Sequence, residues 1–131
     1  MKILFFGDLI GNPGRALLQK HLVNLRMKYS ADLVIVNGEN SAPDGRGITP
    51  DIMNFFKSLS VDVVTTGNHI WAKKEIYPYF QNNKDLLRPL NFPAGCPGSG
   101  LRLHRLAGGT RLCGGGQGAG RVNLRARLAS E

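Results

Sequence analysis

The stretch VDVVTTGNHIW, residues 61–71, indicates both a fold class and a functional site. It opens with closely spaced β-branched residues, which is typical of a strand buried on both faces of a sheet. The apolar run stops at Gly67, and Asn68 and His69 follow directly. In parallel α/β sheets, ligands bind just beyond the carboxyl ends of the strands. The stretch therefore predicts a pair of functional side chains at a strand end.

Two upstream stretches repeat this design. KILFFGD, residues 2–8, ends a predicted strand at Asp8, and DLVIVNGEN, residues 32–40, ends another at Glu39 and Asn40. Parallel strands end at the same edge of their sheet, so these side chains should converge. The expected site consists of Asp8, Glu39, Asn40, Asn68 and His69.

The segments between these strands predict crossover helices. Leucines recur at helical spacing after Asn12-Pro13, where Asn12 suits an N-cap, and a second amphipathic helix follows Thr49-Pro50. Strand–helix–strand units of this length give parallel strands. The predicted fold class is therefore α/β, a parallel sheet with strands near residues 2–7, 32–37 and 61–66 and right-handed crossover helices. Beyond the third strand, residues 73–80 are expected to form a short helix interrupted by Pro78, and residues 86–97 an extended segment.

The side chains at the strand ends suggest metal chemistry. Carboxylate and amide oxygens together with imidazole suit a divalent ion of intermediate hardness, such as Mn, Fe or Zn. A bridging carboxylate, here Glu39, would be consistent with two ions about 3.5–4 Å apart, which activate water and stabilise both oxygens of a phosphoryl transfer. A nearby histidine that binds neither ion can protonate the departing alkoxide.

Four segments then resemble, in order and spacing, the N-terminal half of a bacterial family of calcineurin-like metallophosphoesterases, the 2′,3′-cyclic-nucleotide 2′-phosphodiesterases. They read GDLIGNPGR, VNGENSAPDGRGIT, TTGNHIWAKKEI and LLRPLNFPAGCPGSG, and they cover about residues 1–100. The resemblance implies a phosphodiesterase with two divalent metal ions. It also implies that the sheet is the first half of a two-sheet sandwich, so an apolar face left uncovered could lead to homo-oligomers.

The resemblance also implies a role for each residue. It makes Asp8, Glu39, Asn40 and Asn68 metal ligands and His69 the proton donor. In the implied reaction, a 2′,3′-cyclic nucleotide or a related phosphodiester loses its 2′ ester bond and keeps a 3′-phosphate. Ile10 stands where many metallophosphoesterases have a histidine, and Glu39 stands where an aspartate is usual; both departures belong to this particular family.

A larger departure concerns histidines. The second half of the family supplies three more histidine ligands, whereas this chain has only His21, His69 and His104. His21 falls among helical leucines and is expected to be structural, and His104 lies outside the resembling segments. With ligands missing, we expect weak metal binding and impaired activity, and an inactive fragment is an open alternative.

The composition changes near Gly100, which predicts two regions. Residues 1–100 form a partial metallophosphoesterase domain, and residues 101–131 form a tail rich in Arg and Gly. The tail shows no amphipathic period, and its glycine runs weaken any helix or strand. We therefore expect it to be irregular or disordered, and we hypothesise that a frameshift produced it.

Charge and apolar content narrow the class of protein. Of the net charge of +8, residues 101–131 carry six Arg and one Glu. Nucleic-acid binding through these arginines is an alternative, but the absence from the tail of aromatic residues that would stack on bases weighs against it. A non-catalytic nucleotide-binding module is another alternative, since residues 11–15 could hold a phosphate at a helix N-terminus.

No run of about 18 apolar residues exists, and we expect a cytoplasmic protein without a membrane partner. Cys96 and Cys113 match no zinc spacing and are expected to be ordinary thiols.

Overall fold

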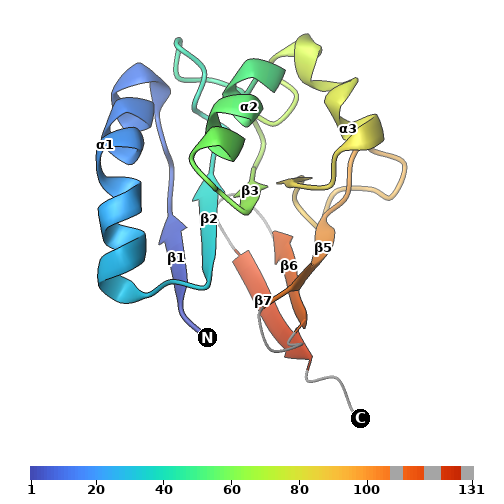
Figure 1. Ribbon diagram of the computed structural model, residues 1–131. Helices are drawn as coiled ribbons and strands as arrows, with labels where there is room; N and C mark the ends of the chain where they lie inside the picture. The colour runs from blue at the N-terminus through green and yellow to red at the C-terminus, as the bar shows by residue number, and fades with distance from the viewer. Residues whose placement is uncertain (107–110, 117–121, 128–131) are drawn as a thin grey trace.

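A four-stranded parallel sheet forms the centre of the protein. The computed structural model describes residues 1–106, 111–116 and 122–127, with side chains described as far as residue 106. The strands are β1 (Ile3–Phe6), β2 (Leu33–Asn37), β3 (Val63–Thr65) and β4 (Leu86–Leu87), and they lie in this order across the sheet (Figure 1). All three pairings are parallel. The predicted fold class and the first three strands are confirmed, and β4 adds a strand inside the segment expected only to be extended.

Two helices cover one face of this sheet (Figure 1). Helix α1 (Gly11–Tyr29) contributes Leu18 and Leu22, and α2 (Pro50–Ser58) contributes Phe56, to the main hydrophobic core. The cap of α2 is as predicted, because the Thr49 side chain accepts a hydrogen bond from the Ile52 N–H and Pro50 opens the helix. The expected Asn12 cap of α1 is wrong. Ile10 occupies the N-cap position, and the Asn12 side chain instead accepts a hydrogen bond from Arg15.

The opposite face of the sheet carries a second, smaller core. Leu33, Ile35, Val63 and Leu87 are buried there, and Leu106 packs against them. Phe5 continues the same face on the edge strand β1, but its side chain is 44% exposed. This face is therefore covered over its centre and partly open along β1.

The expected helix over residues 73–80 divides into two short elements. They are the 3-10 helix η1 (Lys74–Ile76) and α3 (Tyr79–Asn82), with Pro78 as the N-cap of α3. Proline fits this N-terminal position because it needs no hydrogen-bond acceptor there. The interruption at Pro78 is thus a boundary between two elements.

The tail departs from the prediction of irregular structure. Strands β5 (Leu101–Arg105), β6 (Arg111–Gly116) and β7 (Val122–Arg127) form an antiparallel sheet in the order β5-β6-β7. The prediction is wrong for these residues. An antiparallel ladder is held by backbone hydrogen bonds, so Gly114, Gly115 and Gly116 can pair with residues of β5 and β7 despite their low strand propensity. The remainder of the expected irregular tail lies outside the described residues, and the frameshift hypothesis stays a prediction.

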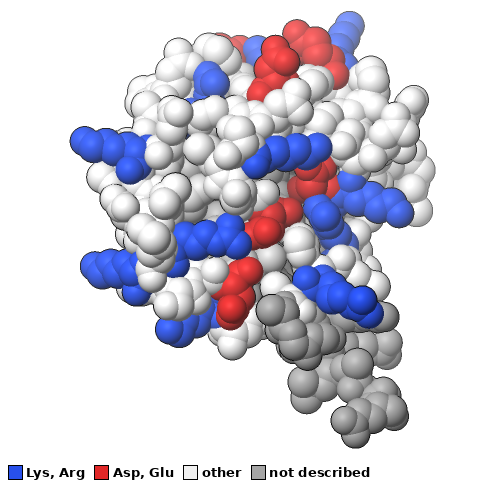
Figure 2. Space-filling model, in the orientation of Figure 1, with Lys and Arg blue, Asp and Glu red and all other residues white. Residues whose placement is uncertain are grey.

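Acidic and basic side chains are interspersed over the surface shown in Figure 2. On the described part of this face, Lys and Arg lie on several elements with Asp and Glu between them, so they form no single basic patch. Among the helices of the described chain, none has the length and apolar character needed to cross a membrane.

Candidate active site

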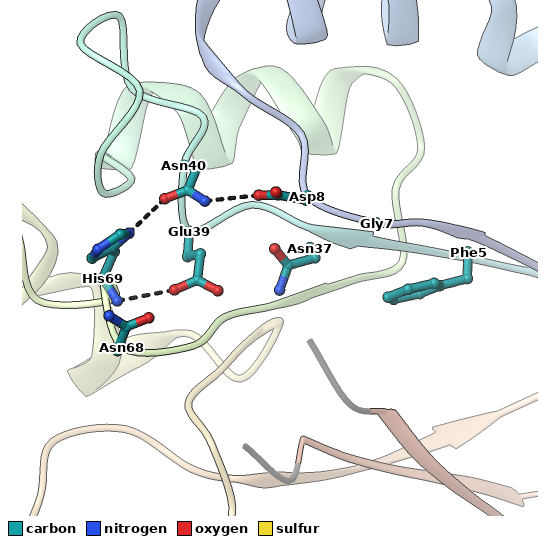
Figure 3. A pocket seen from close by; sticks show the side chains of 8 residues that line it. All are labelled: Phe5, Gly7, Asp8, Asn37, Glu39, Asn40, Asn68 and His69. Atoms are coloured by element: carbon teal, nitrogen blue, oxygen red, sulfur yellow. Dashed lines mark hydrogen bonds between the residues drawn. The ribbon is translucent and has the colours of Figure 1, made fainter. Parts of the chain in front are cut away.

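A polar depression lies at the carboxyl ends of the first three strands. Its volume is about 380 Å³, and Figure 3 shows the side chains that line it. Asp8 follows β1, Glu39 and Asn40 follow β2, and Asn68 and His69 follow β3, and all five line the depression. The structure thus brings together every predicted site residue. Phe5, Gly7 and Asn37 complete the lining.

A chain of hydrogen bonds joins the three strand ends. The side-chain Nδ2 of Asn40 donates to Oδ1 of Asp8 at 2.7 Å. The side-chain oxygen of Asn40 lies 2.6 Å from Nδ1 of His69 (Figure 3). Because the carboxylate can only accept, the Asn40 amide must turn its nitrogen to Asp8 and its oxygen to His69. His69 therefore carries a proton on Nδ1.

Glu39 is fixed in a confined space. Its side chain is 5% exposed, and Oε2 accepts a hydrogen bond from the backbone N–H of His69 at 2.9 Å. Gly67 lies against the carboxylate, since a Cβ added at Gly67 would come within 2.7 Å of Oε2. The absence of a side chain at Gly67 is what lets the carboxylate lie beside the third strand end.

Asp8 occupies the left-handed region of backbone space, with φ at +45°. Few residues other than glycine adopt this conformation, and Asp and Asn are enriched among them. The backbone turns here from β1 toward α1, and the next residue, Leu9, donates from its N–H to the Asn37 carbonyl at 3.1 Å. This turn places the Asp8 carboxylate beside the end of β2.

The loop after β2, residues 38–49, is tied to the turn after β3. Lys73 Nζ lies 2.5 Å from Oδ2 of Asp44, and the Lys73 ammonium lowers the pKa of the Asp44 carboxyl. A Cβ at Gly47 would come within 2.9 Å of the Lys73 side chain, so the two segments also pack closely. The Gly47 N–H donates to the Glu39 carbonyl at 2.5 Å. These contacts hold the loop that carries Glu39 and Asn40 against the segment that carries His69.

Asn37 is a lining residue that the sequence reasoning missed. In the sequence it is the last residue of a predicted buried strand, and its polar side chain at the end of an apolar run is the one signal that marks it. Its side chain is 3% exposed, and its Nδ2 has no hydrogen-bond partner among the described residues. The site thus includes a buried amide whose donor capacity is not used within the protein.

The donor set fits part of a divalent metal site. Two carboxylates and two amide oxygens suit ions that prefer oxygen ligands or tolerate mixed ligands. Within the described residues, no cluster of three His, Cys, Asp or Glu side chains could hold an ion by itself. Amide oxygens of Asn40 and Asn68 would have to share in any metal binding here.

The other two histidines lie away from this depression. His21 is exposed on α1 and lines an adjoining, largely apolar depression, which shares Phe5, Gly7 and Asp8 with the candidate site. His104 lies on β5, where its Nε2 is 3.4 Å from the carbonyl oxygen of Asp62. Asp62 immediately precedes β3, at the end of the sheet opposite to the candidate site.

Comparison with known proteins supplies relatives for most of the chain. Residues 4–125 match the sequence model of the YmdB-like protein family. The chain is 43% identical over 101 residues to a 2′,3′-cyclic-nucleotide 2′-phosphodiesterase of Bacillus subtilis, a match that covers 77% of this chain and 38% of that protein. The length of this match agrees with the predicted extent of the resemblance, about residues 1–100, and the match to the family model continues past Gly100.

Two solved structures share the architecture. A crystal structure of a hypothetical protein from Thermus thermophilus superimposes with a TM-score of 0.77 at 39% identity, covering 86% of this chain and 43% of the other. A phosphatase from Mycoplasma pneumoniae superimposes with a TM-score of 0.72 at 39% identity, covering 79% of this chain and 38% of the other. The chain thus spans less than half the length of each of these relatives.

Proposed function

The chain belongs to the family of YmdB-like proteins, and from this membership we propose that it carries part of the active site of a metal-dependent phosphodiesterase. The proposed substrates are 2′,3′-cyclic nucleotides or related phosphodiesters. Hydrolysis would break the 2′ ester bond and leave a 3′-phosphate. The relative from Bacillus subtilis, whose name states this activity, supports the proposal.

The observation that carries this proposal is the hydrogen-bonded chain Asp8–Asn40–His69 across three strand ends. It places carboxylate and amide oxygens and one imidazole around a shared depression of about 380 Å³. In our proposal Asp8, Glu39, Asn40 and Asn68 would hold two divalent ions, with Mn, Fe and Zn as candidates. Bound there, the ions would supply water activation and charge stabilisation.

His69 has the geometry of a proton donor in this proposal. Its Nδ1–H is engaged by the Asn40 oxygen, and its Nε2 has no hydrogen-bond partner among the described residues. When the ring is protonated, Nε2 can pass its proton to the departing 2′ oxygen. Asn40 would fix the ring orientation, as outer partners of an imidazole commonly do.

The proposed ligands do not suffice for two fully coordinated ions. Two carboxylates and two amides leave open positions on a pair of ions that each take about four to six ligands. We therefore propose that residues 1–100 act as a partial metallophosphoesterase domain, with weak metal binding and little turnover.

Metal titration together with a hydrolysis assay tests the function. Mn²⁺ binding to the purified 131-residue chain is measured by calorimetry, in parallel with the Bacillus subtilis relative. Hydrolysis of bis-p-nitrophenyl phosphate and 2′,3′-cyclic AMP is then followed with Mn²⁺ or with EDTA. We expect weaker Mn²⁺ binding than in the relative, and slow hydrolysis at most, which EDTA abolishes. Absence of Mn²⁺ binding, or turnover that EDTA leaves unchanged, would contradict the proposal. Robust turnover would contradict the claim that the site is partial.

A further inference from the structure

The buried amide of Asn37 has a place in the depression that the proposed metal and acid roles do not explain. Its side chain lines the depression and is 3% exposed, and its Nδ2 finds no acceptor among the described residues. In Figure 3 it is drawn between the Glu39 carboxylate and the Phe5 ring. An unpartnered buried amide is destabilising, whereas an apolar side chain of similar shape would not be.

The local fold explains why Asn37 cannot avoid this position. It ends β2 on the sheet face that carries Leu33 and Ile35, both buried. Its backbone is held on both sides, because its carbonyl accepts from the Leu9 N–H at 3.1 Å and the residue pairs with Thr65 on β3. Thr65, its neighbour across the sheet, has a partner, since its hydroxyl donates to the Val36 carbonyl at 3.5 Å. Of this pair, only Asn37 keeps an unused donor; elsewhere in the described chain, Arg15 Nε and Trp71 Nε1 are also buried without a partner.

The other groups of the depression show which ligand this donor suits. The Asn40 amide donates to Asp8, and the His69 backbone N–H donates to Glu39. These two donors are used within the protein, and the carboxylates present only acceptors. The Asn68 amide, which also lines the depression, is exposed, whereas that of Asn37 is buried. A phosphodiester carries two non-bridging oxygens that accept hydrogen bonds, and a neutral amide can donate to one of them without adding charge.

We propose that the Asn37 amide binds a non-bridging oxygen of the phosphate group of the substrate. This assignment rests on the proposed phosphodiesterase function and adds a substrate-binding residue to it. Asn37 is then neither a metal ligand nor a proton donor. It holds the phosphate at the end of β2, between the oxygens of Glu39 and the aromatic ring of Phe5.

The test uses the whole chain, with 3′-AMP as the probe in the presence of Mn²⁺. Asn37→Leu keeps a branched side chain of the same length, and Asn37→Ala is a smaller second variant. The matched control is Thr65→Val, which removes a polar group from the paired position on β3. For each protein, calorimetry measures Mn²⁺ binding alone and then 3′-AMP binding, and thermal unfolding is measured without either.

We expect both Asn37 variants to bind 3′-AMP roughly tenfold more weakly or worse, as for loss of a hydrogen bond to a charged group. Their Mn²⁺ binding should equal that of the parent, and Asn37→Leu should unfold at the same or a higher temperature. Thr65→Val should bind 3′-AMP as the parent does.

Three results would overturn the assignment alone. They are parental affinity for 3′-AMP in both Asn37 variants, loss of Mn²⁺ binding in the variants, and unfolding of both variants at a lower temperature than Thr65→Val. The first result would mean that Asn37 does not bind phosphate. The second would mean that it is a metal ligand, and the third that its role is structural. If the parent bound Mn²⁺ but not 3′-AMP, the proposed function would fail together with the Asn37 assignment.

Discussion

The Nδ1 atom of His69 lies 2.6 Å from the side-chain oxygen of Asn40, across the ends of the adjacent strands β3 and β2. Asn40 in turn donates to Asp8 at 2.7 Å. The orientation of the imidazole therefore depends on one amide that also contacts the first strand end. Removing the imidazole should leave the oxygens of Asp8, Glu39 and Asn68 in place. A substitution of His69 therefore tests proton transfer without removing a proposed metal ligand.

His69→Ala should lower turnover while metal content stays nearly unchanged. Loss of a positioned general acid typically costs about 10²–10⁴-fold in rate, whereas none of the proposed oxygen ligands is removed. Mn²⁺ binding by calorimetry and hydrolysis of bis-p-nitrophenyl phosphate are measured on the same preparation. Glu39→Gln is the comparison, and it should lose Mn²⁺ and hydrolysis together. Loss of Mn²⁺ from His69→Ala would instead identify His69 as a ligand.

Gly67→Ala should weaken Mn²⁺ binding although it removes no polar group. The added Cβ would come within 2.7 Å of Oε2 and 2.8 Å of Cδ of Glu39, so the carboxylate must shift. Gly95→Ala is the matched control, because nothing lies within 4 Å of a Cβ at Gly95. Calorimetric titration measures the Mn²⁺ affinity of both variants. Equal affinity in the two would show that the position of the Glu39 carboxylate is not critical for Mn²⁺ binding.

Stability should fall at alkaline pH through the contact between α2 and α3. Burial raises the pKa of the Tyr79 hydroxyl, and hydrogen bonding to Tyr79, aided by Asp85, raises the pKa of the Lys57 ammonium. Both groups hold their protons more tightly in the folded chain. Their contribution is therefore complete below the unfolded values of 10.0 and 10.5 and is lost as pH rises above them.

Urea unfolding between about pH 8.5 and pH 11.5, a window of about 1.5 units either side of the reference pKa of tyrosine, measures this effect. Tyr79→Phe should show a shallower decline in the free energy of unfolding than the parent. Tyr77→Phe, at an exposed tyrosine nearby, serves as the control. A decline in Tyr79→Phe as steep as that of the parent would rule out this contact as the cause.

Phe5 should promote self-association. It is 44% exposed on β1, the edge strand of the parallel sheet, and unpaired edges with apolar side chains favour contact with other chains. Phe5→Lys is expected to reduce any increase in sedimentation coefficient with concentration. Met27→Lys places the same charge at an exposed apolar residue of α1. If both variants reduced association equally, net charge and not this edge would be responsible.

The parallel sheet and the convergence of the five candidate residues at one of its edges are predictable because their signals are local. Each strand from β1 to β3 is a largely apolar run, and within three residues of its end, after a glycine, comes a polar residue that the sheet geometry carries to one edge. The short strand β4 was not predictable in this way. Two residues, Leu86 and Leu87, are too few to show a period, and they become a strand only by pairing with Val64 and Thr65.

The strands of the tail and the unpartnered amide of Asn37 are also not predictable from the sequence. Propensity alone weighs against strands in a segment with three consecutive glycines, but pairing with β5 and β7 supplies the backbone partners that a single sequence does not reveal. For Asn37, the sequence shows a polar residue at a strand end but not whether its amide is satisfied. That depends on which groups surround it in three dimensions.

The left-handed backbone at Asp8 restricts how this position can evolve. With φ at +45°, glycine and asparagine would suit the turn, but neither carries a charge. Glutamate would retain the charge, but its longer side chain lacks the local preference of aspartate for this conformation. Aspartate combines the preference for this conformation with a negative charge. Nearly every substitution at this position would therefore lose either the turn or the carboxylate. In the proposed metal site, which needs this carboxylate, Asp8 would therefore tolerate fewer substitutions than most surface residues that follow a strand.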